Sequence, residues 1–216
     1  MFFALIIADL PLIIICTVPV VLALRLTRRL GDEYAWVNRK MIHLSVLPAV
    51  FAYGFILAEP YLFSLVSFLF AFWQYWKRVR GEISLWYQLE ENIGEVYYCL
   101  AFGVMSLVFW RYRLFAMALM LYLAVGDALT GIVRFFYLRR FSSRVFRRKH
   151  IVGSFAMFLT CFLVNFCLFG VSSLVNSIIL ATIATSAEYQ SLIDDNIAIP
   201  LLCSIYYYFV WMQLFP

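Results

Sequence analysis

The sequence predicts an all-α integral membrane protein with about eight transmembrane helices and with both termini on the non-cytoplasmic side. Of its 216 residues, 65% are hydrophobic and only 13% are charged, whereas a soluble domain is roughly 45–50% apolar and about 25% charged. A chain with so few polar residues cannot cover a water-soluble globule. Its apolar residues also come in long runs, and about 20 such residues make a helix that crosses a bilayer. We therefore expect a single membrane domain over residues 1–216.

Eight apolar segments are long enough to span the membrane. In chain order they are 2–24, 41–58, 60–76, 93–110, 113–133, 151–170, 172–188 and 197–214. The first is not preceded by a basic stretch and its apolar run is long, which indicates a retained helix rather than a cleaved signal peptide. The second and third are separated only by a tight turn that Pro60 closes. The seventh is rich in small and polar residues, which favours contact with other helices over contact with lipid.

Lysine and arginine residues determine the predicted orientation, because cytoplasmic loops of membrane proteins carry an excess of them. All 17 except Arg111 and Arg113 fall in the loops that follow the first, third and fifth segments. These loops and the 188–196 loop are therefore predicted to face the cytoplasm. The same placement accounts for the net charge of +5, since basic loops also attract anionic lipid headgroups. We find no nucleic-acid-binding motif and expect no nucleic-acid partner; the oligomeric state is not indicated.

Acidic side chains are costly inside a membrane and often mark a functional site. Asp127 lies in "LYLAVGDALTGIVRFF" of the fifth segment, roughly 10 Å from the basic end of its helix at 1.5 Å per residue. It is either a buried carboxylate paired with an arginine, or a metal ligand or proton acceptor. Glu95, near the start of the fourth segment, is either a carboxylate stabilised by the helix macrodipole or a residue that helps to position a ligand.

The stretch "SLIDDNIAIP" places Asp194, Asp195 and Asn196 just before the eighth segment, and Glu188 ends the seventh. One aspartate is enough to cap the last helix. The whole set, however, offers four oxygen-bearing side chains within nine residues, and carboxylate and amide oxygens are the protein ligands that Mg²⁺ prefers. Helix capping and magnesium binding are both consistent with this pattern.

The stretch "NRKMIHLS" suits phosphate. Arg39 and His43 are four residues apart, so they share a helical face, and Lys40 lies beside them. An arginine can donate two parallel hydrogen bonds to phosphate oxygens, and a lysine attracts phosphate as a point charge. The alternative is a basic anchor that only sets the topology, with the histidine at the membrane interface.

A second basic stretch, "RRKHIVGSF", places Arg148 and Lys149 just before Gly153 and Ser154 at the start of the sixth segment. The N-terminus of a helix attracts anions, although orientation alone would also place basic residues here. Under the predicted orientation, all these acidic and basic groups lie at or near the cytoplasmic face. Groups that bind Mg²⁺ and groups that bind phosphate on one side are typical of phosphoryl transfer, in which catalysis is mostly positioning and charge neutralisation.

Four stretches, "NRKMIHLS", "GDALTGIV", "KHIVGSFAMF" and "DDNIAIPL", together resemble the polyprenol kinase family, which includes dolichol, phytol and farnesol kinases. "GEVYYCL" is similar to a tyrosine-rich segment of phytol-kinase-like members. The resemblance runs over residues 38–216 in the same order. It implies transfer of a phosphoryl group from CTP, or another nucleoside triphosphate, to the terminal hydroxyl of an isoprenoid alcohol. That alcohol would be of the dolichol, phytol, geranylgeraniol or farnesol type.

The resemblance also covers the dolichol kinase nucleotide loop in part. The matching residues are Asp127, Arg148, Lys149 and Gly153. The residues that differ from the dolichol kinase pattern are Arg134, Leu138, His150 and Val152. The shorter phytol-kinase-like members are the better match.

The leading hypothesis is an isoprenoid alcohol kinase in the plasma membrane of a prokaryote or in the endoplasmic reticulum, with its active site facing the cytoplasm. The expected cofactor is Mg²⁺, with Asp127 and Asp195 as catalytic residues. The expected metal ligands are Asp127, Asp194, Asp195 and Asn196. The expected phosphate-binding residues are Arg39, Lys40, His43, Arg148, Lys149, Gly153 and Ser154, with Glu95 and Glu188 in support.

Two alternatives to the kinase stay open. A CTP-dependent cytidylyltransferase would use the same groups, but it would make a CDP-activated lipid and release pyrophosphate. A transporter or lipid-binding protein without chemistry would also carry carboxylates in the membrane.

Overall fold

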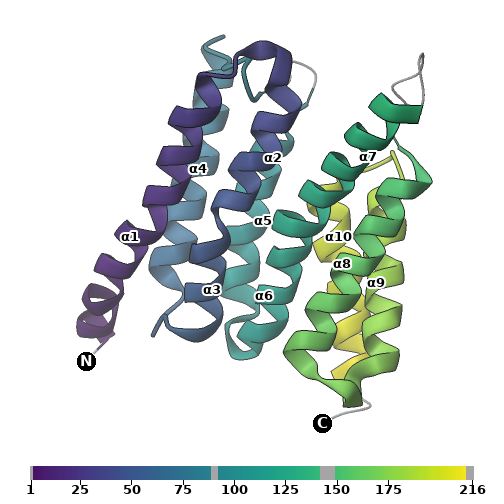
Figure 1. Cartoon of the computed structure of the whole chain (residues 1–216). Coiled ribbons are helices and arrows are strands. Elements are labelled where there is room, and N and C mark those ends of the chain that lie inside the picture. Colours follow the sequence, from purple (N-terminus) through teal and green to yellow (C-terminus); the bar gives the residue numbers. More distant parts are fainter. Residues whose placement is uncertain (1, 89–91, 142–148, 213–216) are drawn as a thin grey trace. The chain divides into compact units, whose positions relative to one another are not determined.

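The computed structural model describes residues 2–88, 92–141 and 149–212, and within these ranges it is helical without any β-strand (Figure 1). The predicted all-α class is therefore confirmed. The chain forms two compact units, Met1–Met120 and Leu121–Pro216.

The first unit is a bundle of helices in which α4 packs along α5, and α1 packs against α2, α3 and α4 (Figure 1). Gly103 of α5 allows the close contact with α4, because a Cβ atom there would lie 2.5 Å from the ring of Phe68. The helices are α1 (Phe2–Arg28), α2 (Ala35–Ser45), α3 (Leu47–Phe55), α4 (Tyr61–Val79), α5 (Gly94–Val108) and α6 (Arg113–Leu121). The short 3₁₀ turns are η1 (Asp32–Tyr34) and η2 (Trp110–Tyr112).

The predicted single helix over 41–58 is wrong. Helix α2 ends at Ser45 and α3 begins at Leu47, with Pro48 at its N-terminus. The physical reason is that proline has no backbone N–H, so Pro48 cannot donate the bond that would join it to the carbonyl of Leu44.

The turn between α3 and α4 is held by a carboxylate that comes from α1. Pro60 is the N-cap residue of α4, in agreement with the predicted turn. Asp9 is buried, and its carboxylate accepts hydrogen bonds from the backbone N–H groups of Ala58 at 3.1 Å and Glu59 at 3.0 Å. A buried carboxylate needs such donors, and these donors tie α1 to the turn.

In the second unit, α8 packs against α7 and α9, and α10 packs against α9 and touches the turn η3. The buried residues Ser177, Ala181 and Ala184 follow one face of α9, which agrees with the predicted use of small residues for helix contact. The helices are α7 (Asp127–Phe141), α8 (Ile151–Phe169), α9 (Leu174–Tyr189) and α10 (Asp195–Tyr206). The short turns are the π-helical η3 (Tyr122–Gly126) and η5 (Tyr207–Trp211) and the 3₁₀ turn η4 (Val171–Ser173).

Four helices of the described residues are long and apolar enough to cross a bilayer: Ile7–Arg28, Trp110–Leu138, Ile151–Phe169 and Val171–Tyr189. They correspond to the first, fifth, sixth and seventh predicted segments, and they make this a membrane-embedded protein. Helix α5 is apolar but shorter. The count of eight spans and the outward termini stay predictions.

Candidate functional site

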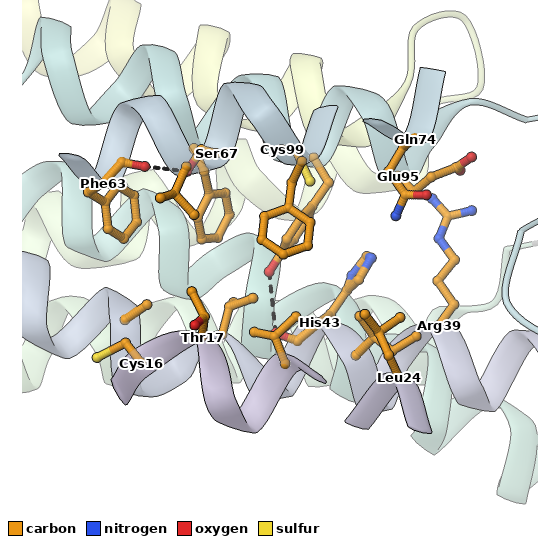
Figure 2. A pocket seen from close by; sticks show the side chains of 18 of the residues that line it. Cys16, Thr17, Leu24, Arg39, His43, Phe63, Ser67, Gln74, Glu95 and Cys99 are labelled. Atoms are coloured by element: carbon orange, nitrogen blue, oxygen red, sulfur yellow. Dashed lines mark hydrogen bonds between the residues drawn. The ribbon is translucent and has the colours of Figure 1, made fainter. Parts of the chain in front are cut away.

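A pocket of about 120 Å³ lies in the first unit between α1, α2, α4 and α5 (Figure 2). This is roughly ten times the space that one water molecule requires. Most of its wall is apolar, and the wall includes Ile13, Val20, Val46, Phe63, Phe70 and Phe102. One end is polar. Figure 2 shows Arg39, Gln74 and Glu95 gathered at that end, with Cys16, Thr17 and Phe63 toward the other. The pocket is therefore an apolar slot with one polar end.

Arg39 and His43 both line this pocket from α2, one helical turn apart. Arg39 has only 8% of its surface exposed, and its buried Nε atom has no hydrogen-bond partner. The ring of His43 stacks on Tyr98 of α5 with the ring centres 4.1 Å apart, and the Tyr98 hydroxyl donates to the His43 carbonyl at 3.3 Å. Lys40 is also buried, but it is not among the described residues that line the pocket.

Glu95 closes the polar end through a buried network that joins α4 and α5. Its Oε1 atom accepts from Arg78 Nη2 at 2.8 Å and from Gln88 Nε2 at 3.1 Å. Gln74 Oε1 in turn accepts from Gln88 Nε2 at 3.1 Å and from the Tyr87 hydroxyl at 2.7 Å. Burial raises the pKa of Tyr87 to about 12, so the hydroxyl is a neutral donor at physiological pH. Glu95 thus lies in the first turn of α5 and also forms an ion pair with Arg78.

The sequence reasoning did not assign Gln74, Tyr87 and Gln88 to a site, and it used Arg78 only for orientation. The signal available was Gln74 itself, an amide in the otherwise apolar middle of α4. A polar side chain in such a helix is costly unless it has partners.

In the second unit, Asp127 is the first residue of α7 and directly follows the π-helical turn η3. It has 6% of its surface exposed. π-Helical turns inside helices are frequent at functional sites, and the sequence pattern had not revealed this one. One turn further on, the Thr130 hydroxyl donates to the Gly126 carbonyl at 2.8 Å.

Lys149 and Glu188, which were predicted in separate roles, pair with each other. Lys149 Nζ lies 3.3 Å from Glu188 Oε1, and it also donates to the Glu188 main-chain carbonyl. The pair joins the segment before α8 to the end of α9. Arg148 lies outside the described residues.

The start of α8 is already well satisfied by hydrogen bonds. The backbone N–H groups of Gly153 and Ser154 donate to the His150 carbonyl at 2.9 and 3.2 Å, and His150 Nδ1 caps the helix by accepting from Val152 N at 3.2 Å. Gly153 also allows α7 and α8 to approach, because a Cβ atom there would lie 3.1 Å from Thr130. In this arrangement the two amides serve the helix, and their predicted contact with phosphate stays a prediction.

At the start of α10, Asp194 is the N-cap. Its Oδ1 accepts from the backbone N–H of Asn196 at 3.0 Å and from Asn196 Nδ2 at 2.8 Å. Asn196 Nδ2 also lies 3.4 Å from Asp195 Oδ1. Asp194 is therefore the aspartate that caps the helix, and Asp195 is the first residue of α10. Within the described ranges, no group of three or more His, Cys, Asp or Glu side chains could hold a metal ion, and the magnesium site stays a prediction.

Comparison with known protein families, with characterised proteins and with solved structures finds no match for this chain. Function must therefore be inferred from the residues themselves.

Proposed function

We propose that this protein is a membrane-bound kinase that transfers the γ-phosphoryl group of a nucleoside triphosphate to the hydroxyl of an isoprenoid alcohol, with CTP as the preferred donor. The observation that carries the proposal is the apolar pocket of the first unit, which ends at the buried guanidinium of Arg39. An apolar chain suits the wall of such a pocket, and an arginine suits a phosphate. Both belong to one lipid phosphate, the product of this reaction.

The chemistry needs few groups. The alcohol oxygen attacks the γ-phosphorus, the bond from that phosphorus to the β–γ bridging oxygen breaks, and the nucleoside diphosphate leaves with the electron pair. The hydroxyl proton passes to a carboxylate, for which Asp127 is the candidate. The oxygen donors of Asp194, Asp195 and Asn196 are of the type that Mg²⁺ takes, and bound Mg²⁺ would neutralise charge on the phosphate oxygens.

The proposal is tested with purified protein, Mg²⁺ and a panel of isoprenoid alcohols, each with CTP or ATP labelled at the γ-phosphate. We expect label in a prenyl monophosphate and release of nucleoside diphosphate. Release of pyrophosphate and label transfer from α-labelled CTP would instead indicate the cytidylyltransferase. If neither product forms with any alcohol in the panel, the proposal is wrong.

A matched pair of variants locates the chemistry. Asp127→Asn keeps the size of the side chain and removes its charge, and we expect it to lower turnover by at least about 100-fold, as loss of a general base does. Asp32→Asn, at an exposed position in η1, makes the same change away from the site and should leave turnover unchanged. Equal rates for Asp127→Asn and the unmodified protein would remove Asp127 from the mechanism.

A further inference from the structure

The buried charges at the polar end of the first-unit pocket do not balance. Two arginines and one carboxylate meet there. Arg78 and Glu95 form an ion pair at 2.8 Å, which uses one charge of each sign. Arg39 has no ion pair within the described part of the chain. Among the described residues at this end of the pocket, one buried positive charge is therefore left without an ion-pair partner.

A buried charge without a partner destabilises the folded protein unless a group of opposite charge pairs with it. Removing a charged group from water carries a penalty of several kcal/mol, and a buried charge is normally paired. Arg39 lines the pocket, and in Figure 2 its side chain lies at the polar end beside Glu95 and Gln74. A ligand group at this end of the pocket would lie beside the guanidinium. A ligand oxyanion at this end of the pocket would supply the missing partner, because a guanidinium binds carboxylate or phosphate oxygens through two parallel hydrogen bonds.

The lining of the rest of the pocket indicates which kind of molecule carries the oxyanion. Away from this polar end the wall is mostly aliphatic and aromatic, with Ile13, Val20 and Phe102 among its side chains. Free phosphate or a nucleotide would gain nothing from this wall. A hydrocarbon chain would gain about 25 cal/mol for each Å² of apolar surface that it buries.

We infer that this pocket binds a single-chain lipid with a phosphate headgroup, with the chain between α1, α4 and α5 and the phosphate on Arg39. That the chain is a prenyl chain rests on the proposed function; the site for a lipid phosphate does not. Helix α1 is essential to the site, because Ile13, Thr17 and Val20 form one of its walls.

The test is equilibrium binding of radiolabelled farnesyl monophosphate to the purified protein in detergent. We expect competition by unlabelled farnesyl monophosphate, weaker competition by farnesol, and none by inorganic phosphate or CTP. Competition by inorganic phosphate or CTP as strong as by the lipid phosphate would show a site for free phosphate and overturn the inference. Stronger competition by a fatty acid of similar length would overturn the phosphate headgroup.

Two variants locate the headgroup. Arg39→Gln should weaken binding of farnesyl monophosphate on the order of 10- to 100-fold, the usual effect of losing hydrogen bonds to a charged group, and should leave farnesol binding unchanged. Arg29→Gln, at an exposed position after α1, removes the same charge outside the pocket and should change neither. Unchanged binding of the phosphate in Arg39→Gln would refute the assignment.

A second pair of variants tests the chain independently of Arg39. Thr17→Phe places a large ring against the apolar end and should weaken farnesyl monophosphate binding at least about tenfold, as loss of the buried chain area requires. Ile14→Phe adds the same ring on the exposed face of α1 and serves as the control. If Thr17→Phe binds as tightly as Ile14→Phe, the lipid chain lies elsewhere.

Binding and catalysis can fail separately. Arg39-dependent binding of farnesyl monophosphate by a protein that transfers no phosphate would support the lipid site and refute the kinase. Phosphate transfer without such binding would support the kinase and refute the lipid site.

Discussion

Arg78 at the end of α4 donates a 2.8 Å hydrogen bond to Glu95 in the first turn of α5, and both side chains are largely shielded from solvent. The two residues come from the ends of neighbouring helices that pack along each other. The ion pair therefore both joins the helices and neutralises the carboxylate at the polar end of the pocket. It leaves Arg39 as the charge that a ligand can meet.

Breaking this pair should be strongly destabilising. Arg78→Gln removes the ion-pair partner of Glu95, and loss of one partner of a buried ion pair costs about 3–5 kcal/mol. Glu95→Gln should cost less, because its amide oxygen still accepts a hydrogen bond. Thermal unfolding in detergent, followed by tryptophan fluorescence, measures both variants, and the double variant measures their coupling. Purely additive losses would show that the two residues do not act as a pair.

Tyr87 should make the stability of the protein sensitive to alkaline pH. Burial raises the pKa of Tyr87 from 10.0 to about 12 in the folded protein, so folding favours the neutral phenol. The contribution is fully present below pH 10 and is lost as the pH rises through about 12. We expect the free energy of unfolding to fall over this range, and to fall less steeply in Tyr87→Phe. Identical slopes in the two proteins would contradict this assignment.

Variants of Asp194 and Asp195 should distinguish a role in capping α10 from a role in catalysis. Asp194→Ala removes the side chain that accepts from Asn196 N, and loss of such a cap costs about 0.5–2 kcal/mol. Asp194→Ser restores an acceptor and should recover most of the stability. Asp195→Ala should cost less stability, since it loses mainly a favourable charge near a helix N-terminus. Under the proposed function, however, Asp195→Ala should lower turnover more than either Asp194 variant does. Unfolding curves and rates measured on the same preparations decide this, and the reverse order would assign the cap to Asp195.

Gly153→Ala should disturb the contact between α7 and α8. The new methyl group would lie 3.1 Å from both the Thr130 carbonyl oxygen and its Cγ2 atom, and a backbone oxygen cannot easily move aside. We expect a loss of about 1–3 kcal/mol, as for other overpacked contacts. Adding Thr130→Ser removes the methyl group but keeps the hydroxyl, and it should recover part of the loss in the same unfolding assay. No recovery would show that the backbone contact alone causes the strain.

The sequence by itself determined the features that depend on composition and on neighbouring residues. The excess of apolar residues over charged ones requires a membrane-embedded helical chain, because too little polar surface is available for water. The spacing of Arg39 and His43 places them on one face of α2, since both lie in the same helix. The adjacent Asp194 and Asp195 predicted a capped helix start. The sequence also identified Asp127 as an unusual acid, but not the π-helical turn before it.

Only the tertiary structure decided how distant segments combine. Asp9 bonds to the turn at Ala58, and Gln74 joins the Glu95 network from another helix. Helix α1, which carries none of the polyprenol-kinase-like stretches, supplies a wall of the pocket. The physical reason is that helix periodicity shows which residues share a face, while the partner of that face depends on how whole helices pack. The charge balance that leaves Arg39 for a ligand follows from that packing.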